Sequence, residues 1–202
     1  MTRALPRRLA GLLALTVVAA ATLAGGAVAQ TGNLTLVGDK TKLVTDPATT
    51  KALLDNGIVP LPVGKTGFEF LNPSQVRYSF PLTGGSVNPS NLFGTIEHSG
   101  GLNVVNTNTG ASLLLTNFRI TIDANPGLSA EVNGNPSVRV RILDLSLKRA
   151  KVISQGRLIR VKNVDAYLTP AAADALNASL GVTIFAPGLK LGVAQVFARV
   201  AA

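Results

Sequence analysis

Apolar and polar side chains alternate with a period of two through most of residues 66–166, and Gly, Pro and Asn interrupt the alternation at short intervals. In residues 75–82, for example, Val76, Tyr78 and Phe80 fall on the same face. This alternation is typical of half-buried strands joined by turns, and many short antiparallel strands build a sandwich or a barrel. We therefore predict an all-β fold, specifically an antiparallel β-sandwich.

The alternation also predicts which side chains point into the core. Successive side chains of a strand point to opposite faces, so every second residue shares an environment. The expected inner faces are Leu114, Thr116, Phe118, Ile120 and Ile122 in residues 112–123, and Val138, Val140 and Ile142 in residues 136–142.

Two short helices are predicted between strands. Asp46 and Thr169 each precede a proline, a pattern typical of an N-cap followed by proline at the first helical position. Gly57 and Gly181 then mark the two helix ends. Each helix completes a strand, capped helix, glycine, strand unit, and we expect both units to cover an open end of the sheets.

The first 29 residues have the features of a cleavable signal peptide. Three arginines precede an uncharged apolar run from Leu9 to Ala24, and Ala27-Val28-Ala29 fits a small-residue cleavage site. We predict one β-sandwich domain in residues 30–202, secreted or associated with the cell envelope. The chain has no cysteine, so disulfides and thiolate metal sites are excluded and packing must stabilise the domain.

Positive charge is concentrated in one part of the sequence. Between residues 139 and 162, Asp144 is the only acid among eight Lys and Arg residues. If the strands pair as expected, their outward side chains form one basic face that could bind an anionic partner. The same charges could instead keep edge strands from pairing with other chains. The predicted basic face consists of Arg139, Arg141, Arg157, Arg160 and Lys162.

The sequence contains no recognisable catalytic constellation, and we predict that the protein is not an enzyme. His98 is the only histidine, and its neighbour Ser99 would point to the opposite face of a strand. His98 is therefore either a hydrogen-bonded core residue or a contact to a planar ligand such as haem, for which imidazole and phenolate are both known ligands. Tyr78 and Tyr167 are the only tyrosines, and each is either a packing residue or a second ligand.

Several segments spread over residues 66–197 form a recognisable series, including RYSFPLTGGSVNPSNLFGTIEHSGGLNVV, LLLTNFRITID, YLTPAAADALNASLG and FAPGLKLGVAQV. Together they resemble the HtaA-type domain of exported bacterial haem-uptake proteins. The resemblance implies an antiparallel β-sandwich, export and haem binding. The family's tyrosine motif, of the type SFRxY after a tryptophan, is absent, and the segment in place of its histidine motif, VVNTNTGASL, contains no histidine. No haem-binding residue therefore carries over to this chain.

Two functions remain as hypotheses. The first is a secreted binding protein for a hydrophobic or anionic small molecule, with haem as the named case and His98, Tyr78 and Tyr167 as candidate contacts. The second is a cell-envelope protein whose basic face binds an anionic wall polymer or a protein partner. Binding of nucleic acid is not expected, because the basic segment lacks interleaved aromatic residues for stacking on bases.

Overall fold

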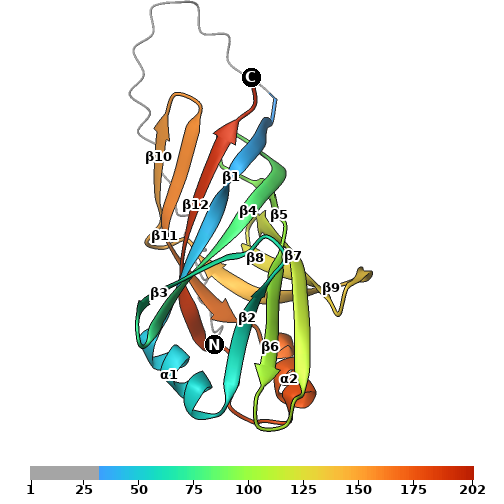
Figure 1. The fold of residues 1–202 in the computed structure, drawn as a ribbon. Coiled ribbons are helices and arrows are strands. Elements are labelled where there is room, and N and C mark those ends of the chain that lie inside the picture. The colour runs from blue at the N-terminus through green and yellow to red at the C-terminus, as the bar shows by residue number, and fades with distance from the viewer. Residues whose placement is uncertain (1–31) are drawn as a thin grey trace, which may run out of the picture.

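The computed structural model of the chain describes residues 32–202, so the predicted signal peptide lies outside the described part. Within this range, 12 strands form one antiparallel sheet, accompanied by two helices (Figure 1). None of the helices described in residues 32–202 is both long enough and apolar enough to cross a membrane.

Eight of the strands close into a barrel. The ring closes because β7 pairs with β5 along one edge and with β8 along the other. The predicted all-β antiparallel fold is confirmed, but the sheet closes on itself where the prediction had two stacked sheets. Around the ring the strands are β7 (Ser112–Ile122), β5 (Gly94–His98), β4 (Gln75–Val87), β1 (Leu34–Thr45), β12 (Lys190–Val200), β11 (Leu158–Leu168), β9 (Asn135–Ser146) and β8 (Gly127–Val132).

The other four strands extend the barrel wall at its edges. β6 (Gly101–Asn106) pairs with the first half of β7, and β2 (Ile58–Val63) pairs with β6. β3 (Gly67–Asn72) pairs with β4, and β10 (Lys151–Gln155) pairs with β11. The β10–β11 hairpin and the projecting part of β9 lie on different sides of the barrel (Figure 1).

Bulges shift the alternation in two strands, and part of the predicted inner faces is wrong for this reason. In β7, Asn117 has a φ of 49° and the pairing with β8 shifts between Thr116 and Arg119. Asparagine tolerates this left-handed conformation, and the extra residue changes which side chains point inward. Phe118 and Ile120 are buried as predicted, but Leu113 and Leu115 are buried before the bulge instead of Leu114 and Thr116.

A similar shift affects β9. The pairing of β8 with β9 changes register between Leu128 and Ser129, and Ile142 and Leu143 are both buried. The inward orientation predicted for Val138 is wrong, because its side chain is 43% exposed. This part of β9 extends past the barrel and pairs with β8 alone.

Both predicted helices are present with the expected caps. α1 (Pro47–Asp55) begins after Asp46, whose carboxylate accepts from two backbone N–H groups. α2 (Pro170–Leu180) begins after Thr169 and ends at Gly181, which adopts a φ of 65°. The two helices lie at the same end of the barrel (Figure 1). The buried face of α2 consists of Ala172, Ala173, Leu176 and Leu180, so this helix is part of the core.

Replacing the cap of α2 tests how firmly this helix is fixed. The Thr169 hydroxyl accepts from the Ala172 N–H at 3.2 Å and donates to the Arg141 carbonyl at 3.0 Å. Thr169→Ala removes both bonds and should lower the free energy of unfolding by about 1–2 kcal/mol in urea titrations. The exposed Thr183→Ala is the control, expected to change it by less than about 0.5 kcal/mol. Equal stability of the two variants would contradict the capping role.

Candidate functional site

One edge of β11 is covered by two strands in succession. Residues 165–168 pair with residues 143–146 of β9, and residues 158–162 pair with β10, which follows β9 after the turn at residues 147–150. Asn163, with a φ of 60°, lies between the two pairings. β9 therefore ends at Ser146, opposite Asp165, and the β9–β10 turn lies beside this point of β11.

A cleft of about 850 Å³ lies at this turn. Its walls come from the turn between β4 and β5, the turn between β7 and β8, the end of β9 with the following turn, and β11. Its volume lies within the range of about 300–1,000 Å³ that is usual for small-molecule sites. Most of the lining is apolar, including Leu92, Phe93, Ile122, Pro126, Leu145, Leu147, Val152 and Val161.

The apolar floor of the cleft continues into the barrel. Ile122, Leu145, Leu147 and Val161 line both the cleft and a smaller, wholly apolar cavity of about 60 Å³ in the barrel interior. At the rim, Phe93 keeps 46% of its surface exposed. An apolar molecule in the cleft would therefore contact the core on one side and an exposed aromatic ring on the other.

A buried carboxylate fixes the charged groups at one wall. Asp165 is 4% exposed, and its Oδ2 accepts from Arg149 Nε at 2.9 Å while its Oδ1 accepts from Arg149 Nη2. Lys190 Nζ also contacts Oδ1, at 2.9 Å. The hydrogen bond from Arg149 holds the pKa of this carboxyl below its ordinary value, and the bond from Lys190 acts in the same direction. Asp165 is therefore ionised and paired with two cations.

Tyr167 lies next to this charged group and also lines the cleft. It pairs with Lys190 of β12 and Asp144 of β9, at the point where β9 and β11 are still joined. Within residues 32–202 the structure gives its hydroxyl no hydrogen-bond partner, so the phenol is available to a ligand.

Tyr78, the second predicted tyrosine, lies in a different place. Its hydroxyl donates to the Pro60 carbonyl at 2.8 Å, and the residue is 3% exposed. Burial raises the pKa of Tyr78 to about 12, which disfavours the phenolate. Tyr78 contributes to a separate apolar pocket of about 340 Å³ between α1, β2, β3 and β4, which Phe68, Phe70 and Leu61 also line.

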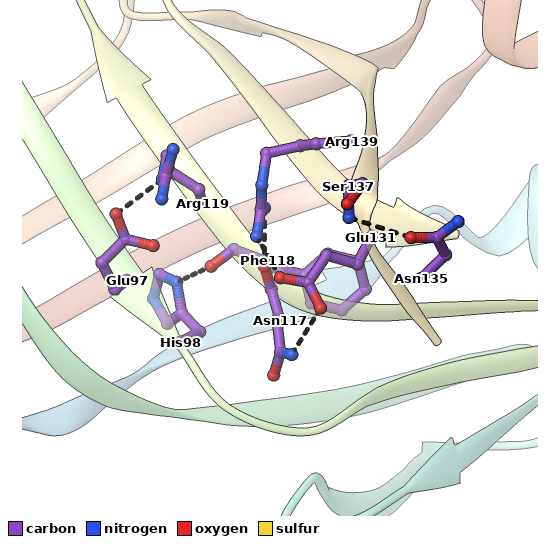
Figure 2. A network of polar contacts seen from close by, with 9 residues as sticks. All are labelled: Glu97, His98, Asn117, Phe118, Arg119, Glu131, Asn135, Ser137 and Arg139. Atoms are coloured by element: carbon purple, nitrogen blue, oxygen red, sulfur yellow. Dashed lines mark hydrogen bonds and ion pairs between the residues drawn. The ribbon is translucent and has the colours of Figure 1, made fainter. Parts of the chain in front are cut away.

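His98 is a buried residue whose two ring nitrogens both have partners, and Figure 2 shows the contact with Phe118. Its Nδ1 lies 3.2 Å from the Phe118 carbonyl, which can only accept, so Nδ1 carries the proton. Nε2 then accepts from the Thr41 hydroxyl at 2.7 Å. Burial lowers the pKa of His98 to about 4, so the ring is neutral at pH 7. His98 lines neither the cleft nor the Tyr78 pocket, and the three predicted ligand residues do not share a pocket.

The structure divides the predicted basic face into two groups. Arg139 and Arg141 lie on the part of β9 that pairs only with β8, away from the β10–β11 hairpin. Arg139 donates to Glu131 at 2.8 Å and to the Asn117 carbonyl, and Arg141 pairs with Asp144 (Figure 2 shows the Arg139 contacts). These two arginines do not lie beside Arg160 and Lys162, because the register places them beyond the end of β11 at Leu168.

The remaining basic residues gather on the hairpin side. Lys151 and Lys162 lie directly opposite each other in the β10–β11 pairing. Arg160 lies over the Phe197 ring at 5.5 Å, and Lys42 of β1 approaches the same ring at 5.4 Å. Arg157, at the start of the hairpin's second strand, donates to the Val200 carbonyl. We call Lys42, Lys151, Arg160 and Lys162 the hairpin basic face.

Sequence reasoning missed Arg149, Asp165 and Lys190 as parts of a site. Asp165 is the only acid between residues 145 and 173, and it lies between Val164 and Ala166 in an apolar segment. A single acid within an apolar segment was the signal in the sequence that could have indicated a buried, paired carboxylate. Its partners could not be identified, because Arg149 lies in the turn between β9 and β10 and Lys190 belongs to another strand.

Solved structures provide the comparison for this fold. No protein-family model matches the chain, and no curated protein matches its sequence. The fold is similar to the C-terminal domain of HtaA from Corynebacterium glutamicum, with a TM-score of 0.59 and 15% sequence identity, over 83% of this chain and 98% of that one. A histidine-to-alanine variant of that domain, solved as a domain-swapped dimer, gives a TM-score of 0.55 at 16% identity, over 76% and 92% of the two chains. The resemblance found in the sequence is thus confirmed at the level of the fold.

The buried His98 should make stability depend on pH. Its folded-state pKa of about 4 lies below the ordinary value of 6.5, so the unfolded chain binds the proton more readily. The stabilisation is complete above pH 6.5 and is lost as the pH falls toward 4. Lowering the pH from 7 to 4 should cost about 3 kcal/mol through this residue alone.

Urea titrations at both pH values, on the natural protein and on His98→Gln, measure this cost. Carboxylates titrate in both proteins, so the difference between them isolates the histidine. The natural protein should lose more stability on acidification than the variant does. The same loss in both proteins would refute a buried, neutral His98.

Proposed function

We propose that this is a non-catalytic binding protein of the cell exterior that holds an apolar ligand in the cleft at the β9–β10 turn. The observation that carries the proposal is the cleft itself: about 850 Å³, mostly apolar, with cations and a phenol at one wall. A large apolar pocket with a few convergent polar groups is the usual form of a ligand site. The HtaA-like fold supports a binding role.

Haem is the candidate ligand. It is flat and largely apolar and carries two carboxylates, so it needs an apolar slot with cations at the rim. Tyr167 supplies a phenol with no partner among residues 32–202, and phenolate is a known haem ligand. Arg149 and Lys148 line the same cleft and could pair with the carboxylates. Haem is also the ligand of the family that the sequence resembles.

An absorbance titration with haemin tests this proposal. We expect a saturable shift of the Soret band in the natural protein, with Tyr167→Phe weakening binding by about tenfold or more, because the phenol oxygen is removed. Tyr78→Phe is the matched control and should bind like the natural protein, since the Tyr78 hydroxyl already donates to Pro60. His98→Ala should also bind normally if it folds. A flat titration, or a loss confined to Tyr78→Phe, would refute haem binding in the cleft.

The hairpin basic face supports a second function, binding to an anionic wall polymer. Like charges directly opposite in a sheet are unfavourable, and Lys151 and Lys162 form such a pair. Residues 145–164 contain no acid that could neutralise them. The hairpin therefore presents concentrated positive charge, which an anionic polymer would relieve.

Heparin chromatography, with heparin as a stand-in anionic polymer, tests the second function. The variant Arg160→Ala/Lys162→Ala should elute at clearly lower salt than the natural protein, because exposed charges dominate such binding. Arg139→Ala/Arg141→Ala removes the same charge from side chains paired with Glu131 and Asp144, and should elute later than the hairpin variant. If the two variants elute at the same salt concentration, net charge alone explains the binding, and the proposed role of the hairpin is overturned.

A further inference from the structure

The buried carboxylate of Asp165 binds one edge of the Arg149 guanidinium, and Arg149 also lines the cleft. Asp165 occupies two of the five guanidinium N–H groups through Nε and Nη2, so the others remain for a ligand. The Arg149 side chain is 62% exposed, while that of Asp165 is 5% exposed. The planar guanidinium is thus fixed in orientation without being covered.

The charges at this wall do not cancel. Asp165 faces two cations, Arg149 and Lys190, so the cluster carries one positive charge in excess. Lys148 adds a second cation to the lining. The other acid of the lining, Asp123, belongs to the turn between β7 and β8 and accepts the backbone N–H of Asn125 at 2.7 Å. Within the lining, the two cations Arg149 and Lys148 match the two acids Asp165 and Asp123. The excess positive charge comes from Lys190, which lies outside the lining and pairs with Asp165.

The apolar floor lies beside this excess charge. Leu145 and Leu147 precede Arg149 in the same segment, and Val161 belongs to the same strand as Asp165. These three side chains also line the apolar cavity in the barrel interior. A molecule filling the cleft would meet a hydrocarbon surface along its body and a fixed cation at one end.

We propose that the cleft selects anionic amphiphiles, molecules with a carboxylate, sulfonate or phosphate on an apolar body, and that Arg149 binds the anionic group. Asp165 is a positioning residue, which orients Arg149 and does not touch the ligand. The inference rests on the proposed function of the cleft and extends it to the class of ligand. This class of ligand includes haem, through its carboxylates, and also acids with an acyl chain.

Two fluorescent probes with the same aromatic body test the proposal. 1-Anilinonaphthalene-8-sulfonate is anionic, and N-phenyl-1-naphthylamine lacks the sulfonate. Arg149→Met keeps the length of the side chain and removes its charge, so it should weaken binding of the anionic probe by about tenfold and that of the neutral probe by less than about twofold. Lys51→Met, on α1 and remote from the cleft lining, is the control and should change neither.

A measurement on the natural protein covers the case in which Arg149→Met folds poorly. Raising the salt concentration should weaken binding of the anionic probe and leave the neutral probe unaffected, because Arg149 is exposed and its charge is screened. The inference is overturned if salt and Arg149→Met change the affinity for both probes equally. It is also overturned if they change the affinity for neither probe.

Failure of the underlying function has a different signature. Phe93→Ala removes an exposed ring at the rim of the cleft and should weaken the binding of both probes by a similar factor. If neither probe binds, or if Phe93→Ala changes neither, the cleft is not the binding site and the proposed function fails as well. If Phe93→Ala weakens binding of both probes and Arg149→Met has no selective effect on the anionic one, the inference about Arg149 fails, but the proposed function of the cleft stands.

Discussion

The succession of β9 and β10 along one edge of β11 is the constraint on which the cleft and both basic groups depend. β9 pairs with residues 165–168 and ends at Ser146, and after the turn at residues 147–150 β10 pairs with residues 158–162. That turn supplies Lys148 and Arg149 to the cleft. The offset between β9 and β11 also places Arg139 and Arg141 beyond the end of β11, while Arg160 and Lys162 lie on the hairpin. The cleft lining and the distribution of surface charge thus have one structural cause.

His98 and Asp165 are buried polar residues whose partners come from other strands and turns. His98 of β5 accepts from Thr41 of β1 and donates to the carbonyl of Phe118 in β7. Asp165 of β11 binds Arg149 from the preceding turn and Lys190 from β12. An unpaired buried polar group is costly, so each of these bonds favours the observed strand arrangement over alternatives. The difference lies in exposure: His98 has no remaining nitrogen for a ligand, whereas Arg149 keeps donors toward the cleft.

Much of the fold was predictable from the sequence, and most of the site was not. The alternation in residues 75–82 and the proline-bearing caps at Asp46 and Thr169 are local signals, and they placed β4 and both helices correctly. Asn117 shifted the inner face of β7, because a one-residue bulge leaves little trace in composition. Ring closure and the short pairing of β9 with β11 depend on contacts between segments that are apart in the sequence. For that reason the sequence indicated Tyr167 and the basic residues individually, but not the cleft that brings Arg149, Asp165 and Tyr167 together.

The central claim is that ligands bind in the cleft at the β9–β10 turn and not in the Tyr78 pocket. Amide chemical-shift mapping during a titration with N-phenyl-1-naphthylamine tests it most directly, because the two pockets share no residue. The account predicts that the largest shifts fall in residues 91–93, 122–126 and 145–152 and around Tyr167. Shifts concentrated in residues 53–62 and 68–78, with those cleft segments unchanged, would contradict it.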